Sequence, residues 1–323
     1  MRLSVLDQSP IIHGQGARRA LAETLALARR VEELGYHRYW LAEHHAIAAL
    51  ADPCPEILLA RLGAETTKLR VGTGGVLLPY YSAFRTAETF RMLEALYPGR
   101  IDLGIGRAPG GDQRTALAVG GGHFPDASHF PQQVAEVSAL LEGEPSAVRL
   151  QPEVDTVPEV WLLGSSDYSG ALAAQLGLRF AFAHFINPRG GDMVARMYRD
   201  SFRPTDKRPK PHVIVCTFAI VADSDEEAER LAAPIDLRRL HMALNIDSPV
   251  PTDAEAAQHQ YSDEERRYVD SQRARAIIGG PAKAKRALEE MVERYGADEA
   301  MVLTITGDYA SRRRSYELLI GAF

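Results

Sequence analysis

The stretch of residues 69–110 constrains the fold more than any other part of the chain, because two strand patterns flank one helix pattern there. Residues 69–78 form an apolar, β-branched run, residues 82–97 repeat apolar side chains at helical spacing, and residues 101–105 form a second apolar run. A helix that returns the chain between two strands leaves those strands parallel. The sequence therefore predicts a parallel strand–helix–strand unit.

Both strands of this unit end in glycine-rich turns, the places where parallel α/β folds bind ligands. The first turn contains Gly74 and Gly75, and the second runs through Gly104 and Gly106 into Arg107. Glycine lets a ligand approach the backbone closely, and arginine adds a fixed positive charge. We interpret the two turns as half of a site for an anion-bearing cofactor. Ordinary turns beside a surface arginine are the alternative, and the spacing G-x-G-x-x-G of a dinucleotide-binding turn is not met.

The alternation of strand and helix patterns continues along the whole chain. Strand patterns occupy residues 3–6, 38–43, 69–78, 101–105, 160–163, 179–185, 213–221 and 299–306. This rhythm predicts a (β/α)8 TIM barrel in a single domain, 1–323, and such a barrel typically needs ~250 residues. Two excursions, 111–158 and 245–280, account for the surplus and are expected over the C-terminal face of the strands. A doubly wound open sheet is the runner-up.

Composition and charge exclude several classes of protein. The chain is 46% hydrophobic and 25% charged, and its net charge of −6 gives no electrostatic reason to expect nucleic acid or an anionic membrane as partner. The longest apolar run is too short to span a bilayer, and the first residues become polar too soon for a signal peptide, so we expect a cytoplasmic protein. Cys54 and Cys216 lie far apart in apolar surroundings and predict neither a disulfide nor a metal site.

Two adjacent histidines, His44 and His45, follow the second predicted strand. Side chains alternate along a strand, so Trp40, Ala42 and His44 share one face and His45 lies on the other. Histidines on opposite faces do not easily share one metal ion, and we expect no metal. One neutral imidazole is expected in the mouth of the barrel as an acid, a base or a hydrogen-bond partner. The alternative is a structural histidine held by a carboxylate such as Glu43.

Two strand-to-helix turns are candidates for binding a phosphate. Free backbone N–H groups and hydroxyls at a helix start suit a phosphate. The first turn reads Gly164, Ser165, Ser166, Asp167, Tyr168, Ser169. An ordinary helix cap is the alternative there, and Asp167 counts against an anion. The second candidate, Gly279–Gly280, is preferred on fold grounds alone, because barrel phosphate sites usually lie late in the chain.

Three blocks, residues 40–45, 71–79 and 87–110, resemble the bacterial luciferase-like flavin monooxygenase family, and the likeness runs along the whole chain. The resemblance implies a (β/α)8 barrel that is usually a homodimer. It also implies a cofactor at the C-terminal mouth, either reduced FMN (FMNH2) or, in some branches, a reduced deazaflavin. A separate flavin reductase would supply the reduced FMN.

The resemblance also implies roles for individual residues. Arg107 matches the arginine that holds the flavin phosphate, and Ser165 with its neighbours matches the second phosphate-binding turn, which raises that turn above Gly279–Gly280. Gly74–Gly75 matches a non-prolyl cis peptide beneath the isoalloxazine ring, and His44 matches the histidine beside the flavin. Gly164 departs from luciferase itself, which has an acidic residue there. Counterparts of the aldehyde-site tryptophans are not found either, so neither light emission nor a long-chain aldehyde is expected.

The function that this resemblance implies is oxidation of a small organic substrate with reduced FMN and molecular oxygen. A deazaflavin-dependent oxidoreductase that transfers hydride without oxygen is one alternative. A non-catalytic protein that sequesters flavin is the other. The two excursions would set the substrate, and the polar, charge-rich residues 245–271 are expected to form an irregular, mobile lid over the barrel mouth.

Overall fold

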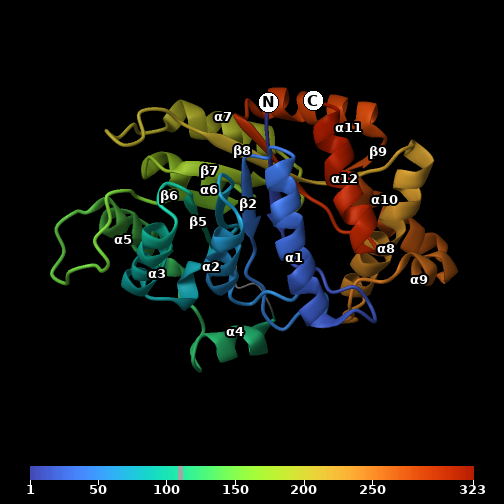
Figure 1. Cartoon of the computed structure of the whole chain (residues 1–323), viewed down its shortest axis with the longest axis horizontal. Coiled ribbons are helices and arrows are strands. Elements are labelled where there is room, and N and C mark those ends of the chain that lie inside the picture. The colour runs from blue at the N-terminus through green and yellow to red at the C-terminus, as the bar shows by residue number, and fades with distance from the viewer. Residues whose placement is uncertain (108–111) are drawn as a thin grey trace.

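The computed structural model describes residues 1–107 and 112–323, which form a closed barrel of parallel strands surrounded by helices (Figure 1). Residues 108–111, which the predictions placed at the end of the block 87–110 and at the start of the first excursion, lie outside the described residues. The strands are β1 (Arg2–Asp7), β2 (Arg38–Leu41), β3 (Arg70–Thr73), β4 (Val76–Leu77), β5 (Ile101–Gly106), β6 (Glu159–Gly164), β7 (Arg179–Ala183), β8 (Val213–Val221), β9 (Ala276–Gly279) and β10 (Glu299–Leu303).

Pairing between the first and last strands closes the sheet. Val5 of β1 lies opposite Val302 of β10, and Met301 of β10 lies opposite Cys216 of β8, both in parallel register. The closed order is β1, β2, β3, β5, β6, β7, β8, β10, while β4 pairs with β5 and β9 pairs with the last residues of β8. The predicted (β/α)8 barrel is therefore confirmed, and the open doubly wound sheet is excluded.

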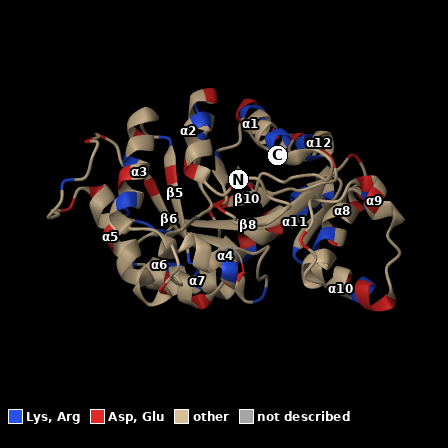
Figure 2. Cartoon of the chain, turned by 90° about the horizontal axis from the view of Figure 1, so that it is seen from below, with Lys and Arg blue, Asp and Glu red and all other residues tan. Residues whose placement is uncertain are grey.

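Most of the helices run along the outside of the barrel and return the chain to the next strand. They are α1 (Gly16–Glu33), α2 (Pro55–Glu65), α3 (Ala83–Leu96), α4 (Gln113–Val119), α5 (Phe130–Glu142), α6 (Asp167–Gln175), α7 (Gly191–Ser201), α8 (Asp225–Ala243), α9 (Asp253–Gln258), α10 (Asp263–Arg273), α11 (Pro281–Tyr295) and α12 (Tyr309–Gly321). Acidic and basic residues are intermixed on these helices in the view from the side on which α4 lies (Figure 2).

Two apolar layers follow from the alternation of side chains along the strands. On β8, which is buried along its whole length, Val213 and Val215 point outward and pack in the cluster between strands and helices. Ile214, Cys216 and Phe218 belong instead to the cluster inside the barrel. The strand therefore reads as a continuous apolar run, as expected for a parallel strand covered on both faces.

A network of charged side chains fills the N-terminal half of the barrel interior. Arg38 is 1% exposed and donates hydrogen bonds to Asp102 (2.6 Å) and Glu299 (2.8 Å). Arg70 donates two more to Asp102, at 3.0 and 2.6 Å. Burial would raise the pKa of Asp102, but the charges of Arg38 and Arg70 lower it. The carboxylate therefore stays ionised and neutralised within the network, which closes this end of the barrel.

The two excursions differ in structure. Residues 112–129 follow the end of β5 and contain α4, which lies apart from the outer helices at the bottom of Figure 1, while residues 143–158 lead from α5 into the start of β6. The prediction that residues 245–271 are irregular is wrong, because they form α9 and most of α10. Each of these helices begins with a capping box, Thr252 with Glu255 and Ser262 with Glu265, which satisfies the free amides of a helix start.

Contacts join the second excursion to loops at the C-terminal ends of the barrel strands. The Ala48 N–H donates to Asp247 at 2.9 Å, and Val250 forms a β-bridge with Ile12. These loops follow β2 and β1, so the excursion lies at the barrel mouth. The mobility of residues 245–271 stays a prediction.

The expectations about metals, disulfides and membranes can be compared with the described part of the chain. Within it, no group of three or more His, Cys, Asp or Glu side chains could hold a metal ion. Cys54 and Cys216 are free thiols. No helix in the described ranges is long and apolar enough to cross a bilayer.

Candidate active site

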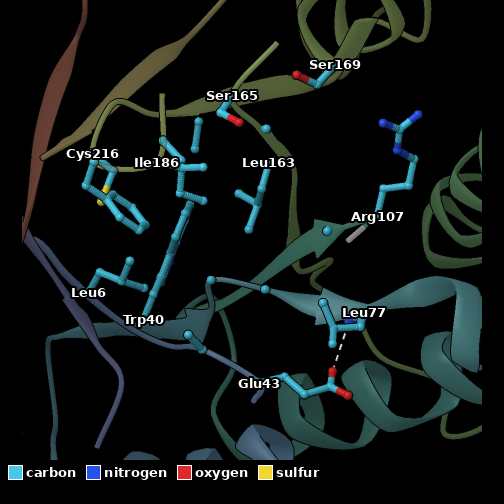
Figure 3. A pocket seen from close by; sticks show the side chains of 18 of the residues that line it. Leu6, Trp40, Glu43, Leu77, Arg107, Leu163, Ser165, Ser169, Ile186 and Cys216 are labelled. Carbon is cyan, nitrogen blue, oxygen red and sulfur yellow. Dashed lines mark hydrogen bonds between the residues drawn. The ribbon is translucent and has the colours of Figure 1, made fainter. Parts of the chain in front are cut away.

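A cavity of about 280 Å³ opens at the C-terminal ends of the barrel strands. Strands from all sides of the barrel contribute to its wall, including β1 through Leu6, β6 through Leu163 and β8 through Cys216 (Figure 3). All the residues predicted from the sequence as site residues line this cavity: His44, Gly74, Gly75, Arg107, Gly164, Ser165, Ser166 and Tyr168. The fold thus brings together side chains that are separated by more than a hundred residues in the chain.

Trp40 lies at the inner end of the cavity and is held in one orientation by the charged network beneath it. Its indole Nε1–H donates to Asp102 at 2.9 Å, and its ring meets that of Trp161 edge-on, with the centroids 5.5 Å apart. Trp40 is buried and its inward face was predicted from strand alternation, which the lining of the cavity confirms for Trp40, Ala42 and His44.

The peptide bond between Gly74 and Gly75 is cis, as predicted. Protein atoms account for glycine at both positions. A Cβ on Gly74 would lie 2.7 Å from Leu6 Cδ1, and one on Gly75 would lie 2.5 Å from Leu163 Cδ1 and 2.7 Å from the Gly104 carbonyl oxygen. Both contacts are closer than real Cβ atoms allow, so any larger residue would displace the cavity wall.

Arg107 and the start of α6 form the positively charged end of the cavity. The Arg107 guanidinium lies over the Tyr168 ring, with Cζ 4.5 Å from the ring centroid. No carboxylate in residues 1–107 and 112–323 forms an ion pair with Arg107, so its charge is available to an anion. The N-terminus of α6 adds backbone N–H groups and the positive end of the helix dipole.

The turn before α6 is built around Gly164 and Ser169. The Ser166 N–H donates to Ser169 Oγ at 3.4 Å, and this hydroxyl donates in turn to the Ser166 carbonyl at 2.7 Å. A Cβ on Gly164 would lie 2.1 Å from Ser169 Oγ, so only glycine fits. The Ser165 carbonyl accepts a hydrogen bond from Asn187 at 3.1 Å, which fixes the outer side of the turn.

The other groups considered for a phosphate do not face the cavity. Asp167, the acidic residue of the α6 turn, is exposed and is not among the lining residues. At Gly279–Gly280, the Gly280 N–H donates to Asp225 at 2.6 Å, and neither glycine lines the cavity. A carboxylate of the chain itself already takes the place of an anion at that second turn.

The two histidines have different surroundings. His45 donates from Nε2 to Glu43 Oε1 at 2.7 Å, the structural arrangement that was the alternative for this pair. His44 lines the cavity, and its Nδ1 is buried with no hydrogen-bond partner among the described residues. Burial lowers the pKa of His44 to about 4, so the imidazole is neutral at pH 7. A neutral imidazole with a free nitrogen can take up or share a proton.

Glu43 is a cavity residue that strand alternation did not predict, since it lies on the opposite face of β2 from His44. Its carboxylate accepts the Leu77 N–H at 2.8 Å (Figure 3) and the Tyr81 hydroxyl at 2.6 Å, in addition to the bond with His45. These bonds tie the end of β2 to β4 and the turn after it. Glu43 therefore supports the wall next to His44.

Apart from Gln8, the remaining wall is mostly apolar, and sequence reasoning did not single it out. Its members come from several elements: Leu6, Leu77, Phe130, Leu163, Ala181, Ala183, Phe185, Ile186, Cys216 and Met301. Apolar residues at such positions look the same in the sequence whether they face a ligand or a packed core. Only the closed barrel shows that their side chains surround a cavity.

Comparisons with known proteins agree with this geometry. The family model of luciferase-like monooxygenases matches residues 1–299. A luciferase-like monooxygenase of Escherichia coli (strain K12) is 40% identical, over 98% of this chain and 95% of that protein. An N-acetyl-S-alkylcysteine monooxygenase of Bacillus subtilis (strain 168) is 34% identical, over 100% of this chain and 98% of that protein. The solved structure of apo-MsnO8 has a TM-score of 0.91 at 35% identity and covers 100% of this chain and 98% of its own.

Proposed function

The chain belongs to the luciferase-like monooxygenase family and is an enzyme, and from this we propose that it is the oxygenating component of a flavin monooxygenase that uses reduced FMN. One observation carries the proposal. A single cavity has an unpaired arginine and a helix start at one end, apolar walls in the middle and a neutral histidine beside them. The charged end suits a phosphate, the apolar walls suit a flat ring system, and the histidine suits a reacting centre beside that ring.

The residues at the charged end would bind the phosphate of FMN. Arg107 offers charge-assisted N–H donors, and Ser165 and Ser166 offer hydroxyls next to the positive end of α6. The glycines at 74, 75 and 106 keep the neighbouring wall flat, so that the ring system would lie against backbone and Leu163. FMN, or a deazaflavin with its own phosphate, fits this donor set.

Reduced flavin supplies the electrons with which molecular oxygen is split, so that one oxygen atom enters the substrate and the other leaves as water. The chain contributes an apolar enclosure that excludes water from this chemistry. His44 would hold or move the proton at the reacting centre, because its buried Nδ1 has no partner in the described chain and its low pKa keeps the ring unprotonated at neutral pH. Glu43, engaged in three hydrogen bonds, would act only through the wall that it supports.

We further propose a separate flavin reductase as the source of reduced FMN and a homodimer as the assembled form. The support for self-association is an exposed apolar surface on the adjacent helices α2 and α3. Ile57 is 70% exposed, Met92 55% and Leu96 53%. Single exposed apolar residues are ordinary, but a group of them on adjacent helices is typical of an interaction surface. Light scattering on the purified chain, with Met92→Glu as the disrupting variant, tests the dimer. A cytoplasmic location is consistent with the two unpaired thiols.

The decisive experiment presents the protein with reduced FMN and with reduced deazaflavin, each with and without oxygen. Tight binding of reduced FMN and oxygen-dependent turnover of any organic substrate support the proposal. Selective binding of the deazaflavin, with turnover that needs no oxygen, would replace it with a hydride-transferring oxidoreductase. Binding of flavin without turnover of a broad substrate panel would leave a sequestering protein.

A further inference from the structure

One face of helix α8 packs against the barrel. The first turns of this face carry apolar side chains, and its last turns carry two arginines. Ala228, Leu231 and Ile235 recur at helical spacing and pack in the cluster inside the barrel. Continuing the same spacing leads to positions 238 and 239, which are Arg238 and Arg239. The opposite face of α8 carries the leucines that pack on α9. The arginines therefore lie on the side of α8 that faces the barrel.

Arg239 lies over the ring of Phe218, with its Cζ 4.8 Å from the ring centroid. Phe218 follows Cys216 on the inward face of β8, one step nearer the mouth, and Cys216 lines the cavity. Arg275 directly precedes β9, and its Nη1 donates to the carbonyl of Ile186, another lining residue, at 3.0 Å. Arg275 thus contacts the β7 side of the cavity wall, and Arg239 packs on β8 next to that wall, although neither is itself a lining residue.

Arg238 is buried, with 7% of its surface exposed. Burial lowers the pKa of His44, and the positive charge of Arg238 lowers it further. Nη1 of Arg238 contacts the sulfur of Met242, and its Nε is buried without a hydrogen-bond partner among the described residues. The acidic group that acts on it is Asp247, whose Oδ1 is held by the Ala48 N–H and forms no ion pair with it.

These arginines lack the partners that a buried guanidinium normally has. Nη1 of Arg239 is also buried and unbonded, and within residues 1–107 and 112–323 no carboxylate pairs with Arg238, Arg239 or Arg275. Asp236, the nearest acid to Arg239, is bound instead by Arg273 at 2.7 Å. Burying an unpaired charge costs several kcal/mol, so the chain gains nothing from this arrangement unless an outside anion completes it.

We propose that Arg238 and Arg239, assisted by Arg275, bind an organic oxyanion of the substrate, and that the substrate of this enzyme is therefore an acid of the carboxylate or sulfonate class. The acid group would lie at the α8 side of the mouth, across the cavity from Arg107. The inference rests on the proposed function for its oxidation chemistry, but anion binding itself needs no turnover. Planar guanidinium groups favour a carboxylate, which they can bind through two parallel hydrogen bonds.

Titration calorimetry on the chain, with FMN and without it, tests the proposal with three probes of equal length: hexanoate, hexanesulfonate and hexanamide. We expect at least one of the two anions to bind about tenfold or more tightly than the neutral amide, since hydrogen bonds to charged groups contribute that much. The arm that binds better identifies the acid class. Equal binding of all three probes by the wild-type chain would overturn the proposal.

Variants show which residues bind the anion. Arg238→Gln and Arg239→Gln should each reduce the preference for the anion over the amide. In the double variant, the affinity for the anion should be within about twofold of the affinity for the amide. Arg266→Gln is the matched control, because Arg266 lies on the neighbouring helix α10 and stacks on Tyr261, with its Cζ 4.6 Å from the ring centroid. If a Gln variant does not fold, Arg239→Lys keeps the charge without the planar donor pair, and the wild-type comparison of probes stands alone.

The outcomes separate this inference from the proposed function. An anion preference that survives when the chain neither binds reduced FMN nor consumes oxygen would support the subsite and contradict the monooxygenase. Oxygen-dependent turnover of neutral substrates only, with no anion preference, would contradict the subsite and leave the monooxygenase. An anion preference that persists in the double variant would place the anion elsewhere and overturn the assignment to α8.

Discussion

The guanidinium of Arg107 lies 4.5 Å from the centre of the Tyr168 ring, and this contact joins the end of β5 to the first turn of α6. The two residues are the rim of the proposed phosphate end, and Tyr168 is partly exposed while Arg107 has no ion-pair partner in the described chain. The Tyr168 ring therefore holds the Arg107 guanidinium in one position, whereas without the ring this side chain would be free to move in solvent.

This contact predicts how the cofactor affinity depends on position 168. Tyr168→Leu should weaken FMN binding by about two- to fivefold, because an exposed cation–π contact is worth ~0.5–1 kcal/mol. Tyr168→Phe keeps the ring face and should bind FMN as the wild type does. Fluorescence titration measures both, and an equal loss in Phe and Leu would assign the effect to the hydroxyl.

Gly164 should be intolerant of any side chain. Gly164→Ala places Cβ 2.1 Å from Ser169 Oγ, so the first turn of α6 must shift, at a cost of ~1–3 kcal/mol in the free energy of unfolding. Adding Ser169→Gly to Gly164→Ala removes the clash and should restore much of the lost free energy of unfolding. Gly106→Ala is the control, since among the described residues its Cβ would meet nothing closer than 3.7 Å. Chemical denaturation decides the order of the variants.

Much of this arrangement could be predicted from the sequence, because it depends on residues that are close together in the chain. The alternation of Trp40, Ala42 and His44 and the glycine-rich strand ends can be recognised without knowledge of the fold. The Thr252–Glu255 and Ser262–Glu265 pairs were also local signals for helix starts, but the charge density of residues 245–271 outweighed them and led to an irregular lid.

The rest could not be predicted, because it depends on contacts across the barrel. The glycines at 74 and 75 looked like room for a ligand, whereas Leu6 and Leu163 fill the space where their side chains would be. The orphan donors of Arg238 and Arg239 have no sequence signature at all, since an arginine on a helix is ordinarily a solvated one.

The pKa of His44 predicts acid sensitivity. Its folded value is about 4 against 6.5 for an ordinary histidine, because burial disfavours the charged form. Between those values the unfolded chain binds the additional proton, so the free energy of unfolding falls as the pH drops from 6.5 to 4 and is fully retained above 6.5. His44→Gln should reduce this slope by up to one proton, about 1.4 kcal/mol per pH unit. His37 and His184, whose pKa values are also lowered to about 4, leave a residual slope in the variant. Unchanged pH dependence in His44→Gln would mean that its imidazole titrates normally.

His44 should affect chemistry more than cofactor retention. His44→Ala should keep FMN affinity within about tenfold, while product formation falls by ~10²–10⁴ and hydrogen peroxide rises relative to product. His45→Ala is the matched control, because His45 pairs with Glu43 and does not line the cavity. Peroxide and product are measured together after mixing with reduced FMN and oxygen. Wild-type coupling in His44→Ala would make the residue structural.

The cavity between Arg107 and His44 is proposed to hold reduced FMN, and anaerobic titration of the wild-type chain and of Arg107→Ala with FMNH2 measures this binding. We predict one FMNH2 per chain for the wild type and a loss of ~1.5–3 kcal/mol, or about ten- to 150-fold in affinity, for Arg107→Ala. Arg203→Ala removes an exposed arginine that does not line the cavity and should bind like the wild type. Equal affinity of the wild type and a folded Arg107→Ala, or no binding of FMNH2 by either, would contradict the account.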